Sequence, residues 1–146
     1  MSQGAPGALA GAWVFVCGPS GSGKDSVMQW AQHALKDRPD IVFSRRNVTR
    51  PAQPGSDHDP MTAEEFSTQR QTAALRWHWE AHGFGYGISS RYADEVVRGK
   101  IVVVNGSRAH LLDVMDSVSA TELRVVQVVA APAAMTGPWL GFPWAR

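Results

Sequence analysis

The sequence predicts an α/β protein with a P-loop NTPase fold, in which helices flank a parallel-sheet core. The glycine-rich segment Gly-Pro-Ser-Gly-Ser-Gly-Lys-Asp at 18–25 lies between an apolar run at 12–17 and a stretch with helical spacing. A second apolar run, at 101–104, does not alternate with polar residues, which is typical of a parallel strand covered on both faces. A third such run, at 125–130, supplies the last strand.

The segment at 18–25 has the features of a loop that binds nucleoside triphosphate. Glycines let the backbone N–H groups converge on phosphate, the following helix adds positive potential, and Lys24 can reach the β and γ phosphates of ATP. An ordinary glycine-rich turn is the alternative, but the flanking strand and helix favour the phosphate loop. The residues expected to bind the nucleotide are Gly18, Pro19, Ser20, Gly21, Ser22, Gly23, Lys24, Asp25 and Ser26.

The residue after the lysine of such a loop is usually Ser or Thr, which holds Mg²⁺. Here Asp25 stands in that position, with Ser26 beyond it. A carboxylate can bind Mg²⁺ directly or through water. Because its charge would lie close to the phosphates, we expect Asp25 to act on Mg²⁺ from the outer sphere.

Composition indicates one domain, 1–146, with its core at about 12–131. The chain has 146 residues, of which 44% are hydrophobic, enough for a buried core. A net charge of +1 gives no reason to expect nucleic acid as a partner, and the single cysteine, Cys17, excludes a disulfide framework. No run is long enough to span a membrane, and the first residues do not resemble a signal peptide, so we expect a cytoplasmic enzyme.

The next elements follow from local patterns. A helix after the loop is expected to turn Val27, Trp30, Ala31, Ala34 and Leu35 inward, and 41–44 reads as a short strand. The segment 45–59, basic and then rich in Pro, Gly and Asp, is expected to be an exposed functional loop. A capping-box pattern at 62–65 predicts a helix to about 71, and 73–80 and 83–88 predict a strand, a turn and a second strand. Residues 43–88 are therefore expected to form a small, mostly polar insertion in the larger fold, a candidate for the acceptor-binding part of the domain.

The core is expected to resume with a helix at 90–98, which Gly99 ends. The segment 105–108, Asn-Gly-Ser-Arg, comes directly after the buried strand, where open α/β sheets bind their ligands. Ser107 is expected to cap the next helix, with Leu111, Leu112 and Met115 facing inward. Residues 132–146 contain several Pro and Gly and support no long helix.

The order of these motifs resembles the guanylate kinase superfamily over about 13–131. The matching segments are the phosphate loop, Ser-Arg-Arg-Asn-Val-Thr-Arg-Pro at 44–51, Glu-Glu-Phe at 64–66, His-Gly-Phe-Gly-Tyr-Gly at 82–87 and Gly-Lys-Ile-Val-Val-Val at 99–104. The loop, Trp-His at 77–78 with Tyr-Gly at 86–87, and 105–108 are more similar to the ribose 1,5-bisphosphate phosphokinases of phosphonate utilisation. That resemblance implies conversion of ribose 1,5-bisphosphate to 5-phospho-α-D-ribose 1-diphosphate (PRPP) by ATP. Related kinases continue after 131 with an arginine-bearing lid and a closing helix, so the tail is expected to be shortened or altered.

The positions at which this chain departs from guanylate kinases also favour a phosphorylated acceptor without a guanine base. Guanine presents N–H donors along one edge, so a pocket that selects it needs acceptors. Guanylate kinases resemble one another in placing carboxylates at two positions where this chain has Trp77 and, after the strand, Asn105 with Ser107. Guanidinium and phenol groups remain, and these suit phosphate. The expected acceptor-binding residues are Arg46, Arg50, Tyr86 and Asn105, and the expected catalytic residues are Lys24 and Arg50.

Each of these residues could instead have an ordinary structural role. Arg50 could be a solvated loop charge, Tyr86 could simply pack, and Trp77 and Trp79 could form a half-buried strand. Three functions stay open. They are a phosphotransferase that acts on a phosphorylated sugar with ATP and Mg²⁺, a guanylate or other nucleoside monophosphate kinase, and a nucleotide-binding module whose short C-terminus impairs turnover. The sequence leaves the oligomeric state undetermined.

Overall fold

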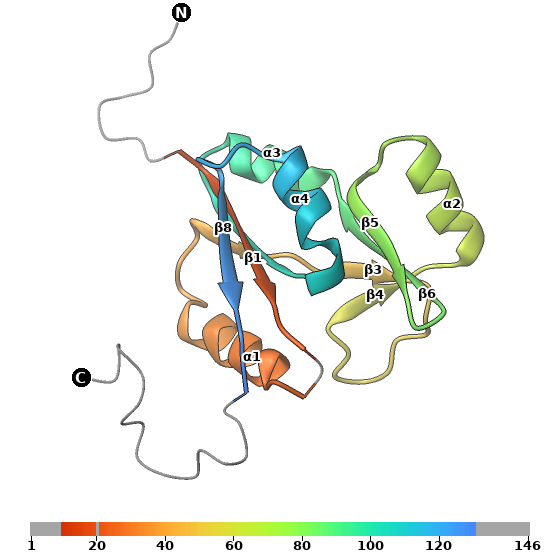
Figure 1. Ribbon diagram of the computed structural model, residues 1–146, viewed down its shortest axis with the longest axis horizontal. Coiled ribbons are helices and arrows are strands. Elements are labelled where there is room, and N and C mark those ends of the chain that lie inside the picture. Colours follow the sequence, from red (N-terminus) through yellow and green to blue (C-terminus); the bar gives the residue numbers. More distant parts are fainter. Residues whose placement is uncertain (1–9, 20, 131–146) are drawn as a thin grey trace, which may run out of the picture.

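The computed structural model describes residues 10–19 and 21–130, and this part contains two four-stranded sheets (Figure 1). In chain order the elements are β1 (Ala12–Cys17), α1 (Lys24–Ala34), β2 (Ile41–Phe43), β3 (Arg46–Val48), β4 (His58–Pro60), α2 (Ala63–Gln71), β5 (Leu75–Ala81), β6 (Phe84–Ser89), α3 (Arg91–Val97), β7 (Ile101–Asn105), the 3-10 turn η1 (Arg108–His110), α4 (Leu111–Ser117) and β8 (Leu123–Gln127). The atypical tail predicted at 132–146 lies outside the described residues.

The first sheet is the predicted parallel core. Its strand order is β2-β7-β1-β8, and every neighbouring pair is parallel. In this register Phe15 of β1 lies beside Val104 of β7 and Val125 of β8. In Figure 1, α3 and α4 lie on one side of β1 and β8, and α1 lies on the other. The α/β class with helices on both sides of a parallel sheet is thereby confirmed.

One hydrophobic cluster joins this sheet to α3, α4 and the second sheet. Alternate residues of β1 and β7 point into it, as expected from the two-residue period of a strand. Its buried members are Trp13, Phe15, Cys17, Trp77, Ile88, Tyr92, Val96, Val102, Val104 and Val114. Trp77 of β5 packs on Trp13 with ring centroids 4.5 Å apart and donates from Nε1 to Ser117 Oγ at 2.8 Å.

The second sheet lies within residues 46–89 and has the order β4-β3-β6-β5. The prediction that 45–59 is entirely loop was wrong, because β3 and β4 pair in parallel at its two ends. Each strand is only three residues long, too short to show a period. His58 is the buried residue of β4, with 2% exposure, so its pattern is not that of an apolar strand.

Two helix ends agree with the chemistry predicted for them. Thr62 caps α2 in a complete capping box, in which Glu65 N–H donates to Thr62 Oγ1 at 3.0 Å and Thr62 N–H donates to Glu65 Oε2 at 2.8 Å. Gly99 follows α3 with φ +90°, a left-handed conformation that costs glycine little. Both boundaries were therefore fixed by local interactions.

Two helix faces differ from the prediction. In α1, Val27 is 45% exposed and Trp30 is 72% exposed, Ala34 is also exposed, and no residue of the helix is fully buried. Ala31 and Leu35 of the predicted face are half-buried, as expected, but Met28 joins them in place of Val27, Trp30 and Ala34.

In α4, Leu112 is 72% exposed and Met115 is 49% exposed, whereas Val114 is fully buried and Leu111 half-buried. Ser107 makes no capping hydrogen bond here. The turn η1 comes between Ser107 and α4, which delays the helix and rotates its faces.

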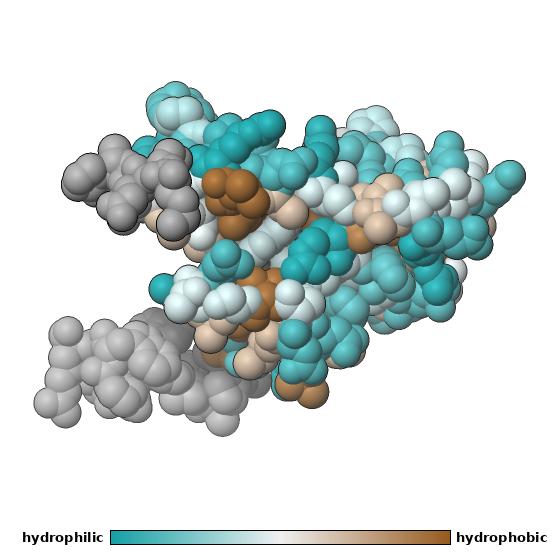
Figure 2. Space-filling model, turned by 90° about the horizontal axis from the view of Figure 1, so that it is seen from above, coloured by the Kyte–Doolittle hydropathy of each residue, from teal (hydrophilic) through white to brown (hydrophobic). Residues whose placement is uncertain are grey.

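Figure 2 shows that on the face seen there, apolar residues form separate brown patches among hydrophilic ones.

Candidate active site

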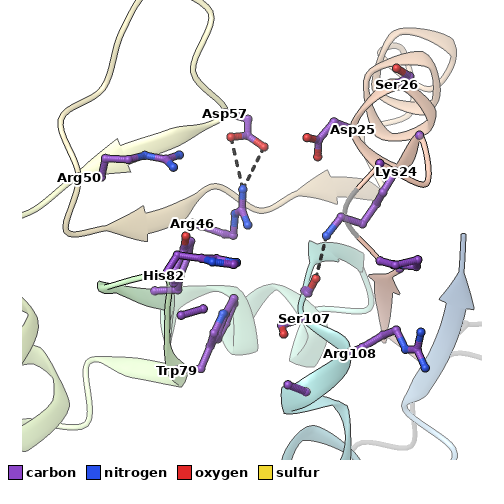
Figure 3. A pocket seen from close by; sticks show the side chains of 18 residues that line it. Lys24, Asp25, Ser26, Arg46, Arg50, Asp57, Trp79, His82, Ser107 and Arg108 are labelled. Atoms are coloured by element: carbon purple, nitrogen blue, oxygen red, sulfur yellow. Dashed lines mark hydrogen bonds and ion pairs between the residues drawn. The ribbon is translucent and has the colours of Figure 1, made fainter.

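A cavity of about 680 Å³ lies where the carboxyl ends of β1 and β7 face the second sheet (Figure 3). The phosphate loop and the start of α1 form one wall, the second sheet forms the opposite wall, and the segment after β7 forms the floor. Its lining residues are Gly18, Pro19, Gly21, Gly23, Lys24, Asp25, Ser26, Arg46, Arg50, Asp57, Trp79, Ala81, His82, Tyr86, Gly106, Ser107, Arg108 and Ala109. The predicted nucleotide loop and most of the predicted acceptor residues thus meet around one space.

The phosphate loop requires glycine at particular positions. Gly21 and Gly23 have φ of +78° and +86°, which residues with a Cβ rarely adopt. At Gly18 a Cβ would lie 2.5 Å from the carbonyl oxygen of Val128, so only glycine fits beside β8. Helix α1 begins at Lys24 directly after Gly23, without a side-chain cap, which leaves its first N–H groups available to an anion. Of the predicted loop residues, Ser20 lies outside the described part of the chain.

Lys24 crosses from the loop to the end of β7. Its Nζ donates to the carbonyl oxygen of Gly106 at 3.1 Å. Burial lowers the pKa of Lys24 from its ordinary value, and the charge of Arg46 lowers it further, while Asp25 acts in the opposite direction. An anionic phosphate beside Nζ would offset this loss of solvation.

Gly106 is a part of the site that sequence reasoning placed correctly but did not explain. A Cβ on Gly106 would lie 2.0 Å from Cζ of Phe15, so the backbone runs directly over that buried ring. Its N–H donates to the carbonyl oxygen of Val16 at 2.8 Å. The turn that carries the partner of Lys24 is therefore held against β1 by packing and by a hydrogen bond.

Arg46 projects from β3 into the cavity and pairs with Asp57. The Nη2–Oδ2 distance is 3.2 Å, and the arginine side chain is only 15% exposed. Its guanidinium carbon lies 5.6 Å from the centre of the Tyr86 ring, and Nε has no hydrogen-bond partner among residues 10–19 and 21–130. Sequence reasoning missed Asp57, although its position after a Pro-Gly-Ser turn in the insertion was a usable signal.

Arg50 also lines the cavity, and a buried histidine steadies it. Arg50 Nη2 lies 3.5 Å from Nδ1 of His58, and Nε2 of His58 lies 3.2 Å from the carbonyl oxygen of Arg50. A tautomer with its hydrogen on Nε2 satisfies both contacts. Arg45, by contrast, pairs with Asp59 at 2.9 Å and does not line the cavity.

Asn105 lies behind the main cavity, not on its lining. It is 6% exposed, and its Nδ2 donates to Asp25 Oδ1 at 3.5 Å and to Asp57 Oδ2 at 3.4 Å. Its Oδ1 has no hydrogen-bond partner in the described part of the chain. Carboxylates are the hard oxygen donors that Mg²⁺ prefers, so Asp25 and Asp57 fit that ion, while Asn105 turns its Nδ2 toward both of them and holds them as a hydrogen-bond donor.

The remaining wall of the cavity is aromatic. Tyr86 is 8% exposed and stacks on Trp79 with ring centroids 5.5 Å apart. His82 reaches the cavity from the turn between β5 and β6, where it and Gly83 have φ of +54° and +78°. Sequence reasoning assigned Trp79 and His82 no role in the site, because alternation alone does not show which face of a hairpin meets a cleft.

Comparison with curated proteins finds close relatives. The chain is 46% identical over 124 residues to the ribose 1,5-bisphosphate phosphokinase PhnN of Acidiphilium cryptum, a match covering 85% of this chain and 65% of that protein. The chain is a homologue of the ribose 1,5-bisphosphate phosphokinases named PhnN. The PhnN protein of Pseudofrankia inefficax is 42% identical over 120 residues, which cover 81% of this chain and 59% of that protein. The chain thus spans less than two thirds of the length of both relatives.

Among solved structures, guanylate kinase from Anaplasma phagocytophilum matches with a TM-score of 0.65 at 19% identity. The match covers 82% of this chain and 60% of that protein, and it shows the guanylate kinase-like P-loop fold. No family model matches the chain. Among residues 10–19 and 21–130, no helix has both the length and the apolar character needed to cross a bilayer.

Proposed function

We propose that this chain is an ATP-dependent phosphotransferase that converts ribose 1,5-bisphosphate to 5-phospho-α-D-ribose 1-diphosphate. The observation that carries the proposal is the cavity, in which the phosphate loop and Lys24 face Arg46, Arg50 and Tyr86. The homology to proteins named for this reaction supports it. Such a cavity can place two phosphorylated molecules end to end, as phosphoryl transfer requires.

The donor side is the phosphate loop. Backbone N–H groups of the loop and Nζ of Lys24 would hold the β and γ phosphates of ATP. Bound Mg²⁺ would neutralise charge between those phosphates, with Asp25 and Asp57 as its residues, directly or through water. Lys24 is already held at the centre of the site by Gly106, so little side-chain ordering remains at nucleotide binding.

The acceptor side is the second sheet. Arg46 and Arg50 are both held in place by partners, Asp57 and His58, and both reach the cavity. They would grip the phosphates of the sugar and direct an oxygen of the 1-phosphate at the γ-phosphorus. That oxygen forms the new P–O bond as the bond to the β–γ bridging oxygen breaks, and ADP leaves. The attacking oxygen is already anionic at neutral pH, so no general base is needed.

The acceptor preference is supported by the residue that takes the place of a guanine-reading carboxylate in the motif order. That residue is Trp77, which is 4% exposed, packs on Trp13 in the core and donates its own N–H to Ser117. It does not line the cavity, so this position supplies no acceptor for guanine. Each unsatisfied donor of a buried guanine would cost about 1–3 kcal/mol.

The test is a panel of acceptors in an ADP-release assay, with ribose 1,5-bisphosphate, GMP and other nucleoside monophosphates. We expect ribose 1,5-bisphosphate to give by far the highest kcat/KM and ³¹P NMR to show a new diphosphate. Lys24→Ala should abolish turnover with unchanged circular dichroism, whereas Lys36→Ala, an exposed lysine just after α1, should not. A preference for GMP would instead indicate a nucleoside monophosphate kinase. ATP binding without turnover would favour a nucleotide-binding module.

A further inference from the structure

Two aromatic rings stack on Trp79. Tyr86, its directly paired neighbour on β6, stacks with centroids 5.5 Å apart and planes 4° apart. His110, which comes from η1, stacks with centroids 5.3 Å apart and planes 26° apart. Because β5 is the edge strand and Tyr86 lies on its β6 side, His110 reaches Trp79 from the open edge of the sheet, and the two rings together cover both faces of the indole. The guanidinium of Arg46 lies over Tyr86 at 5.6 Å. We call Tyr86, Trp79 and His110 the aromatic column, with Arg46 at its end.

The column runs along the acceptor side of the cavity. Trp79 and Tyr86 come from neighbouring strands, β5 and β6, at directly paired positions, while His110 comes from η1 after the core strand β7. Arg46, Trp79 and Tyr86 all line the cavity. The His110 side chain is 14% exposed and pairs with Asp113 at 3.3 Å, so its ring is held against the column.

Proteins that bind bases present an exposed aromatic face to them. In this cavity the indole face, the largest one available, is already taken on both sides. Of the aromatic column and Arg46, only ring edges and the guanidinium are left for a ligand, and these suit anionic oxygens better than a flat base. One ring, that of Trp79, stands between Tyr86 and His110, so its removal would leave room for a single planar group there.

We infer that Trp79 is a specificity-determining residue, which fills the slot where a nucleobase would otherwise stack between Tyr86 and His110 and so restricts the acceptor to phosphorylated sugars without a base. The inference rests on the proposed function, and it adds the residue that enforces the choice. Removing the indole should leave an aromatic slot of the right thickness, because cavities created in this way bind planar ligands.

The test compares wild-type chain with Trp79→Ala, using GMP and ribose 1,5-bisphosphate as the two ligands. GMP affinity, measured by calorimetry without ATP, should rise about tenfold or more, the scale of one base-stacking contact. The ratio of kcat/KM for the sugar to that for GMP should fall by a similar factor. Free indole should compete with GMP for the slot and restore the ratio.

The matched control is Trp30→Ala, which removes a tryptophan that is 72% exposed on α1. It should leave both ratios unchanged. Trp79→Phe, which fills the slot only partly, should give intermediate values and serves if Trp79→Ala does not fold. A Trp79 variant that loses activity on both acceptors equally and gains no GMP affinity would overturn the inference. If the wild-type chain already prefers GMP, the proposed function fails instead, and the calorimetric comparison still stands on its own.

Discussion

Replacing Gly106 with alanine tests whether the close approach of the backbone to Phe15 builds the nucleotide site. The new Cβ would lie 2.0 to 2.5 Å from three atoms of the Phe15 ring, well inside the 3.4 Å at which ordinary contact begins. The ring is fully buried and packs edge-on to Trp77 with centroids 6.4 Å apart, so it has little space to retreat. The Gly106 backbone is also fixed, through its hydrogen bond to Val16.

Overpacking a well-filled core costs about 1–3 kcal/mol, and this site should lie at the upper end. For a domain of this size each kcal/mol lowers Tm by about 2–4 °C, so Gly106→Ala should lower Tm by about 6–12 °C. Calorimetry measures the shift. ATP affinity should also fall, because the carbonyl of residue 106 holds Lys24.

A double-mutant cycle separates the clash from other effects. Phe15→Leu shortens the side chain that the new methyl would meet. If the clash causes the loss, the double variant should be more stable than the two single losses predict, by about 1 kcal/mol or more. Additive losses, or a normal Tm for Gly106→Ala, would refute the account.

Three further outcomes are expected. Thr62→Ala should lower the free energy of unfolding by about 1 kcal/mol in urea, because it removes the N-cap of α2, while the acceptor KM stays the same. Burial lowers the pKa of His110 below its ordinary value, although the charge of Asp113 acts in the opposite direction. As the pH falls, the unfolded chain therefore binds a proton at His110 before the folded protein does. Stability should fall as the pH drops below about 6.5 and level off below the lower folded pKa, and this slope should shrink in urea titrations of His110→Phe. Asp25→Asn should raise the Mg²⁺ concentration needed for half-maximal enhancement of ATP binding, unlike Asp40→Asn at an exposed ion pair.

Local signals in the sequence predicted much of the fold. The glycines at 21 and 23 need a left-handed backbone, and the capping box at Thr62 fixes a helix start through contacts three residues apart. The unbroken apolar run of β7 is the pattern of a central parallel strand, and it pairs on both sides here. These elements depend on neighbours in the chain, which is why sequence alone could place them.

The parts that escaped prediction depend on residues far apart in the chain. The approach of Gly106 to Phe15 joins segments 91 positions apart, and nothing near either residue signals it. Asp57 became a site residue only because β3 and β4 pair and bring it to Arg46. In α4 the inward position predicted for Leu111 is confirmed, but those predicted for Leu112 and Met115 were wrong, because a 3-10 turn intervenes before the helix. The substrate class came from resemblance between motifs, not from spacing or composition.

The hydrophobic cluster around Trp77, which the two sheets share, affects how the protein unfolds. The indole belongs to the second sheet but packs among the side chains of the core sheet. If either sheet unfolded alone, the apolar side chains that it shares with the other would be exposed to water. Unfolding should therefore be a single cooperative transition, without a state in which only the acceptor sheet has melted. Slowly exchanging amides of β5 and β6 near Trp77 would then have the same opening free energy as those of β1 and β7.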